Sequence, residues 1–316
     1  MKYGKVAVFG GAGFVGSALT PMLADLGAEV LVIDSLFTGD LRFLPQRPNI
    51  HIASGDIVET DWVPAFKEFA PDVVVNLAAI HFIPLCNKNP FEALRVNMLG
   101  FQRILENSKD TKGVIFASSA AVYGPSDDPH PETQRVALCD IYGLTKIQGE
   151  ELLELWSMQT GVPGRAARLF NVVGPNETNP HLLPEIFHQS RTSDVINLGN
   201  IDTKRDYIYS EDIARGIIAQ IDTLDDGKNF DMYNVGTGFE YSAKELIEIL
   251  ATVSGRPIQA VSVPERYRPS DRPHLCADNS KLRATGWKPE NDIETSIRKT
   301  WEDFQATGFL KPYPES

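Results

Sequence analysis

The sequence predicts an α/β fold in which a doubly wound parallel sheet is joined to a smaller C-terminal α/β lobe. Three observations predict it. Short apolar runs alternate with helix-forming runs over the first half of the chain, a glycine-rich turn follows the first apolar run, and the regular alternation ends after Asn171. The predicted boundaries are 1–170 for the first domain and 171–316 for the second lobe, with room for some later segments to return to the first domain.

Composition limits the classes of partner. The chain has 316 residues, is 42% hydrophobic and carries a net charge of −12, which argues against nucleic acid as a main partner because phosphate binding favours a basic surface. No apolar run reaches the roughly 18 residues of a membrane span, and glycines interrupt the apolar N-terminal stretch, so it does not resemble a signal peptide. Cys86, Cys139 and Cys276 match neither a disulfide framework nor a metal pattern. We therefore expect a soluble, cytoplasmic protein.

The first strand and the turn after it predict a phosphate site. Residues 5–9 are apolar, Gly10, Gly13 and Gly16 follow in GxxGxxG spacing, and an apolar-periodic helix is expected over 14–26. Glycines let the backbone approach a pyrophosphate at the helix N-terminus, where free N–H groups and the helix dipole favour anions. The arrangement predicts a dinucleotide site.

The second strand, EVLVID, ends in Asp34, 18 residues beyond Gly16. A carboxylate at this place can bind the ribose hydroxyls of the adenosine, and it would repel a 2′-phosphate. The sequence therefore favours NAD over NADP.

Strands and helices continue to alternate along the chain. The carboxyl ends of buried parallel strands such as 72–79 and 113–119 face the ligand crevice in this class of sheet. Ser242 and Glu245 form a capping box that predicts a helix start. Predicted strands beyond Asp34 are 51–56, 72–79, 113–119, 164–170, 195–199, 205–209, 231–235 and 258–263. Predicted helices are 59–69, 91–107, 142–159, a short one after the Pro- and Asn-rich loop that begins at 171, 210–222, 242–254 and 292–305.

Ser119, Tyr142 and Lys146 are the candidate catalytic residues. Tyr142 and Lys146 stand four apart at the head of a helix-forming run, so they share one helix face. An ammonium near a phenol stabilises the phenolate and lowers its pKa below the usual value of about 10. The Ser119 hydroxyl can bond the same substrate oxygen. The trio predicts general acid–base chemistry on an alcohol, although YxxxK alone also occurs by chance in helices.

These motifs together resemble the extended short-chain dehydrogenase/reductase family, and within it the nucleotide-sugar epimerases. The matching stretches follow the family order along nearly the whole chain: GGAGFVG, DSLFTGD, GDI, NLAA, RVNMLG, SSAAVYG, YGLTK, RLFNVVGP, KRDYIYSEDIA, YNVGTG and RPSDRPHLCAD. The resemblance implies a Rossmann sheet for the first domain, NAD as cofactor and a nucleotide-diphosphate sugar as substrate.

The resemblance also implies roles for single residues. Guanidinium groups such as those of Arg205 and Arg268 suit diphosphate oxygens. The alternative for either arginine alone is a surface ion pair. The alternative for His81 is a hydrogen-bonded polar residue that contacts no ligand. Implied cofactor contacts are Gly10, Gly13, Phe14, Val15, Asp34, Ser35, Asp56, Ile57, Leu77, Ala78, Ala79, His81, Asn97 (as a support from below), Tyr142, Lys146 and Phe170. Implied substrate contacts are Ser119, Asn171, His181 (where the family often has asparagine), Leu182, Arg205, Arg268 and Asp271.

The implied reaction is NAD-dependent 4-epimerisation of a nucleotide-diphosphate hexose through a transient 4-keto sugar. Ala121 stands where dehydratases and decarboxylases of the family generally carry an acidic residue, which disfavours dehydration. A UDP-hexose is the first choice, either UDP-glucose/UDP-galactose or an N-acetyl or uronic acid relative. Leu198 and the pair Pro180–His181 depart from the uracil-binding pattern, and Leu275 occupies the position whose bulk affects whether an N-acetyl group fits.

Two other functions stay open. One is an NAD(P)H-dependent reductase or synthase of a nucleotide-linked 4-keto sugar, which Asp34 disfavours because such reductases mostly use NADPH. The other is a non-catalytic dinucleotide-binding regulator, which usually lacks the tyrosine or the lysine. The resemblance further implies a homodimer through helices 91–107 and 142–159. The first of these carries Phe91 and Leu105 among its apolar residues, and the alternative is packing within the monomer.

Overall fold

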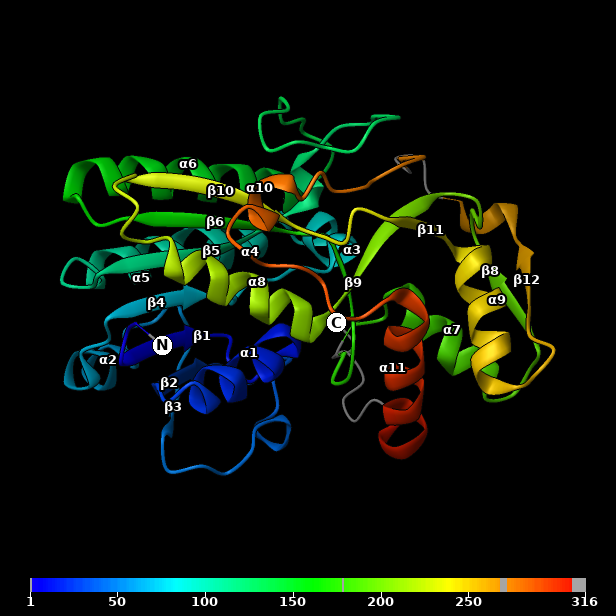
Figure 1. Ribbon diagram of the computed structural model, residues 1–316, viewed down its shortest axis with the longest axis horizontal. Helices are drawn as coiled ribbons and strands as arrows, with labels where there is room; N and C mark the ends of the chain where they lie inside the picture. Colours follow the sequence, from blue (N-terminus) through cyan, green and yellow to red (C-terminus); the bar gives the residue numbers. More distant parts are fainter. Residues whose placement is uncertain (1, 178, 268–271, 309–316) are drawn as a thin grey trace.

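The computed structural model describes residues 2–177, 179–267 and 272–308 and shows two lobes (Figure 1). A seven-stranded parallel sheet forms the larger lobe. Its strands, from edge to edge, are β10 (Phe230–Val235), β6 (Gly164–Leu169), β5 (Gly113–Ser119), β4 (Val73–Asn76), β1 (Lys5–Phe9), β2 (Glu29–Asp34) and β3 (Ile50–Ser54). This is the predicted doubly wound fold.

Apolar strands place a core on each face of the sheet. Along β1, Val8 packs with the core that contains Leu19, whereas the next residue, Phe9, packs on the other face with Trp62 and Phe66. Strands buried on both faces need continuous apolar runs, which is why the sequence shows them. Helices α1 (Phe14–Asp25) and α8 (Ser210–Asp222) cover one face. Helices α2 (Val63–Phe69), α5 (Phe101–Asn107) and α6 (Ile141–Thr160) cover the other.

The smaller lobe lies at the right of Figure 1 and has its own core, with Phe187, Trp301 and Phe304 at its centre. A three-stranded sheet joins β11 (Glu240–Ser242), β9 (Lys204–Tyr209) and β7 (Asn171–Val173), and a two-stranded sheet joins β12 (Gln259–Ser262) and β8 (Val195–Leu198). The helices of this lobe are α7 (Leu182–Ser190), α9 (Ala243–Ser254) and α11 (Ile293–Thr307). The predicted capping box is present, since Ser242 and Glu245 bond each other's backbone N–H.

Segments after residue 170 also build the larger lobe. Strand β10 pairs in parallel with β6, and α8 packs against α1 and these strands. A short helix, α10 (Ser280–Arg283), contacts β10. The polypeptide therefore passes between the lobes repeatedly.

Three predicted boundaries are wrong, and local polar contacts explain two of them. The helix predicted from residue 59 begins at Val63, because the Asp56 carboxylate accepts from Val58 N–H at 2.9 Å and makes a turn first. The strand predicted to residue 79 ends at Asn76, whose side chain accepts from Ala78 N–H at 3.1 Å. The strand predicted to end near Asp56 ends at Ser54.

The predicted helix 91–107 is present but not uniform. It consists of α4 (Pro90–Leu94), a π-helical segment (Arg95–Gly100) and α5, and it is preceded by a short helix, α3 (Ile83–Lys88), that the sequence did not predict. Phe101 and Leu105 are buried within the monomer core. Phe91 and Leu99 stay on the surface, 75% and 59% exposed. Within the described residues, no helix is both long and apolar enough to cross a bilayer.

A buried ion pair fixes helix α6 over the sheet. Arg168 of β6 donates from Nε and Nη2 to the two carboxylate oxygens of Glu150 at 2.8 and 2.7 Å, and both side chains are almost fully buried. Glu150 also accepts from the Ser118 hydroxyl at 2.5 Å. A bidentate pair of this kind gives a fixed geometry. It therefore sets the position of the helix that carries Tyr142 and Lys146.

Candidate functional site

A cavity of about 1630 Å³ lies between the two lobes, at the carboxyl ends of the central strands. Loops after β1, β2, β4 and β5 line it on one side, and segments of the smaller lobe line it on the other. The sequence-predicted residues that line it are Gly10, Gly13, Phe14, Val15, Asp34, Ser35, Asp56, Ile57, Leu77, Ala78, Ala79, His81, Ser119, Tyr142, Lys146, Phe170, Asn171, His181, Leu182 and Arg205. The predicted Arg268 and Asp271 lie outside the described residues.

The glycine turn fits an anionic group. Gly10 has φ +76°, and a Cβ there would lie 2.8 Å from the backbone nitrogen of Ala78. Gly13 precedes α1, so no side chain caps the first turn, and that turn carries no acidic residue. Uncapped N–H groups and the positive end of the helix dipole therefore face this part of the cavity. The turn suits the pyrophosphate of a dinucleotide.

Asp34 lies at the end of β2, 8% exposed, on the same cavity wall. Its carboxylate accepts from Ala12 N–H at 3.0 Å and from Leu36 N–H at 2.8 Å. These two bonds hold a negative charge beside the glycine turn. The charge suits ribose hydroxyls and disfavours a phosphorylated ribose.

The strand β5 and the helix α6 bring the candidate catalytic trio together. Ser119 ends β5, and Asp140 caps α6 by accepting from Gly143 N–H at 2.7 Å. The Ser119 side chain lies near the Tyr142 hydroxyl and accepts from Ala121 N–H at 3.1 Å. Lys146 Nζ lies 5.5 Å from the centre of the Tyr142 ring and donates to the Ala117 carbonyl at 2.7 Å.

The electrostatics of the trio differ from the expectation for Tyr142. Burial raises the pKa of its phenol above the usual range, and the nearby Ser119 side chain opposes this only in part. Burial also lowers the pKa of Lys146 to about 8. The predicted lowering of the phenol pKa by Lys146 is therefore wrong for the protein alone. Desolvation dominates, and the ammonium is bound to Ala117.

Asn97 supports the cavity rather than lining it. Its side chain accepts from Ile80 N–H at 2.8 Å, and it donates to the Ile80 carbonyl at 2.9 Å and to Thr145 Oγ1 at 3.1 Å. These bonds tie the loop that carries His81 to helix α6. The support from below that the resemblance implied corresponds to this geometry.

Arginines from the smaller lobe approach the cavity. Arg205 of β9 lines it and donates to the Arg272 carbonyl at 2.7 Å. Arg272 also lines it, 3.8 Å from Asp140 at the start of α6, and was not predicted as a site residue. The sequence signal that points to it is its place in the stretch RPSDRPHLCAD. The cavity thus offers cationic groups for an anionic ligand.

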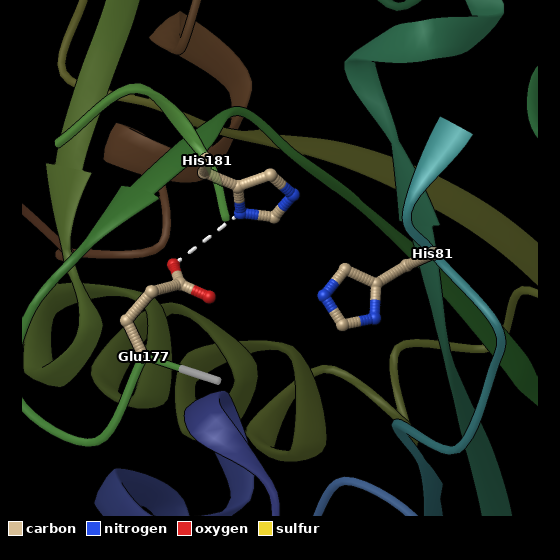
Figure 2. Close-up of side chains that lie close together, drawn as sticks. All are labelled: His81, Glu177 and His181. Atoms are coloured by element: carbon tan, nitrogen blue, oxygen red, sulfur yellow. Dashed lines mark ion pairs between the residues drawn. The ribbon is translucent and has the colours of Figure 1, made fainter. Parts of the chain in front are cut away.

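The His81 and His181 rings approach each other at the cavity wall, and the carboxylate of Glu177, from the same loop as His181, lies near both (Figure 2). His181 Nδ1 lies 3.4 Å from a Glu177 carboxylate oxygen, and His81 Nε2 lies 2.8 Å from Asn179 Nδ2. Burial, with the nearby His181, lowers the pKa of His81 to about 4. Glu177 and Asn179 were not predicted, because only the fold brings their loop to His81.

Comparisons with known proteins agree with this geometry. A model of the NAD dependent epimerase/dehydratase family matches residues 6–236. The chain is 30% identical to a UDP-glucose 4-epimerase of Lactobacillus helveticus, over 94% of this chain and 96% of that protein. It is similar to the UDP-N-acetylglucosamine 4-epimerase from Methanobrevibacter ruminantium in complex with UDP-N-acetylmuramic acid (TM-score 0.87, 30% identity, 97% and 100% coverage). It is also similar to the Thermus thermophilus UDP-glucose 4-epimerase in complex with NAD (TM-score 0.84, 28% identity, 95% and 99% coverage).

Proposed function

Because the chain belongs to the NAD-dependent epimerase/dehydratase family, we propose that it catalyses the 4-epimerisation of a nucleotide-diphosphate hexose. The observation that carries the proposal is that Ser119, Tyr142 and Lys146 meet on the wall of the cavity that the glycine turn also lines. The cofactor is NAD, and Asp34 and the uncapped start of α1 are the groups that fit it. When bound, NAD supplies a hydride acceptor and returns the hydride.

The protein's own groups move and hold the proton. Tyr142 exchanges a proton with the hydroxyl at the reacting carbon through its phenolic oxygen, and Ser119 bonds the same substrate oxygen. Lys146 supplies positive charge beside the phenol, and Ala117 and the buried pair of Glu150 and Arg168 hold this helix in place. Asn171 and Arg205 line the far side of the cavity, where they would hold the diphosphate while the sugar turns over.

A UDP-hexose is the first choice of substrate. The relatives named above act on UDP-glucose or UDP-N-acetylglucosamine, which supports a uracil nucleotide here. Leu198 and Leu275 are buried and line the cavity, so the base and the sugar would meet apolar walls of intermediate bulk. Ala120 and Ala121 line it too, and neither offers the carboxylate that elimination of water would use.

The reaction can be followed without added cofactor if NAD stays bound. Purified protein is incubated separately with UDP-glucose, UDP-N-acetylglucosamine and UDP-glucuronic acid, and the anomeric and H4 signals are recorded by proton NMR. We expect the galacto-configured product in at least one tube. The same tubes are then repeated with added NAD⁺, so that loss of cofactor in purification is separated from lack of activity.

Absence of product signals in all tubes with NAD⁺ present would contradict the choice of these three sugars. Stoichiometric consumption of NADH or NADPH with a nucleotide-linked 4-keto sugar would favour the reductase or synthase alternative. Binding of NAD without turnover of any nucleotide sugar would favour a non-catalytic regulator, although the presence of the full trio argues against it.

We propose that the protein is a homodimer that pairs through α4–α5 and α6. Four apolar side chains on these adjoining helices are exposed: Phe91, Leu99, Leu155 and Met158. An exposed apolar face of this kind is typical of an interface. Sedimentation velocity is expected to give the mass of two chains, and the double change Leu99→Lys with Met158→Lys is expected to give one. Leu138→Lys, at a 70% exposed loop residue, is the matched control. A monomeric native protein would refute the proposal.

A further inference from the structure

Two loops that are far apart in the sequence place three potential metal ligands on one wall of the cavity (Figure 2). His81 lies in the loop after β4, whereas Glu177 and His181 lie in the loop between β7 and α7. One ligand atom from each lies within 4.8 Å of the other two. The proposed epimerisation gives these three side chains no joint role, so their convergence calls for another explanation.

The donor set matches a borderline divalent metal. Two imidazole nitrogens and one carboxylate are ligands that zinc accepts, and three protein ligands leave a fourth position open. With metal–ligand bonds of about 2.0–2.2 Å, tetrahedral geometry separates two ligand atoms by about 3.4 Å. His181 Nδ1 and the Glu177 oxygen are already 3.4 Å apart. The distances to His81 are no longer than 4.8 Å. The His181 side chain is 40% exposed, so it has room to adjust.

Neighbouring groups already orient two of the ligands. One side of the His81 ring lies near the backbone of Ala79, and Figure 2 shows its other side turned towards Glu177. Glu177 is 6% exposed, and its second oxygen accepts from Asn179 N–H at 3.1 Å. Such outer hydrogen bonds fix ring and carboxylate orientation in metal sites. A metal on His81 Nε2 would replace the hydrogen bond that Asn179 Nδ2 now makes there.

We propose that His81, Glu177 and His181 bind one divalent ion of the zinc class and that this ion joins the loop after β4 to the loop before α7. All three ligands line the cavity, so the open coordination position faces its interior. The ion would connect the larger lobe to a segment of the smaller lobe across the wall of the cavity. Binding to the folded chain alone also stabilises it by mass action.

The test is a titration of metal-free protein with ZnCl₂ by calorimetry, in a Cys139→Ser background because Cys139 is an exposed free thiol. We expect one Zn²⁺ per chain and a rise in melting temperature with Zn²⁺. His181→Ala and Glu177→Gln are each expected to weaken binding by at least about tenfold. Co²⁺ in place of Zn²⁺ should give visible absorption bands that report the coordination geometry, and both variants should lose them.

His51→Ala is the matched control, since His51 Nε2 lies 2.7 Å from a Glu29 oxygen in an exposed histidine–glutamate pair elsewhere. It should leave Zn²⁺ binding unchanged. Equal affinity in His181→Ala, Glu177→Gln and the parent, or an equal loss in His51→Ala, would overturn the proposal. Thermal melts of the metal-free variants verify that each still folds. No nucleotide sugar enters the test, so its outcome is independent of the proposed reaction.

Discussion

Tyr142→Phe is expected to lower kcat by about 10²- to 10⁴-fold while NAD stays bound, because the change removes the oxygen that exchanges the substrate proton in the proposed mechanism. The aromatic ring remains to fill the same partly buried space, so the fold should be retained. The measurement is the rate of epimerisation by NMR with the sugar that the native enzyme accepts, together with the NAD content of the purified variant.

Tyr233→Phe provides the control. Tyr233 is 4% exposed and does not line the cavity. It should keep kcat within a few-fold of the native value. A Tyr142→Phe enzyme with kcat within tenfold of native would show that another group moves the proton. Loss of NAD together with activity would point to a role of the hydroxyl in binding.

Gly16→Ala is expected to abolish NAD binding and to destabilise the protein by roughly 2–3 kcal/mol. A Cβ at Gly16 would lie 2.2 Å from the Gly10 carbonyl oxygen and 2.6 Å from Gly11 Cα, so backbone rather than a flexible side chain has to move. Helical glycine to alanine normally stabilises by about 0.5–1 kcal/mol, so the sign of the change is itself informative. Urea unfolding and NAD binding by fluorescence measure the two effects.

A graded series of glycine variants tests the cause. The Cβ contact lengthens from Gly16 to Gly13, where the Gly10 oxygen would be 3.2 Å away, and to Gly4, where the nearest atom is 3.7 Å away on the Asp72 side chain. Gly13→Ala should therefore perturb the turn less, and Gly4→Ala should leave NAD affinity unchanged. Native-like NAD affinity in Gly16→Ala would show that the turn tolerates displacement and that close helix–turn packing is not what shapes the site.

Local patterns in the sequence were sufficient for much of the fold and for the cofactor side of the site. β5 occupies the predicted residues 113–119, because a short apolar run bounded by polar residues favours a buried strand. The glycine turn was predictable because its close backbone contacts require glycine, and the glycines are visible in the sequence. By contrast, the six-residue helix α3 has no capping side chain, and so short a helix depends on tertiary packing.

Contacts between distant segments could not be predicted from local sequence patterns. β10 was predicted as a strand, but periodicity does not tell which strand it pairs with, and its place beside β6 comes from the fold. Glu177 belongs to no sequence motif. It is recognised as a potential ligand only because the loops after β4 and β7 place two histidines near it. The pKa of Tyr142 was misjudged for a similar reason, since spacing along a helix reveals a neighbouring charge but not the extent of burial.

The repeated passage of the chain between the lobes restricts how this protein could be recombined with its relatives. A chimaera with a single crossover near residue 170 would receive not only a foreign substrate lobe but also a foreign β10 and α8, which must then pair with the native β6 and α1. Mismatched edges would leave β6 without its neighbour and expose a strand edge to other chains. An exchange of substrate preference is therefore better attempted by transplanting the segment between β6 and α8, the segment between β10 and α10, and α11, which completes the core of the smaller lobe. The resident β10, α8 and α10 then stay in place, and the scaffold that holds the cofactor stays intact.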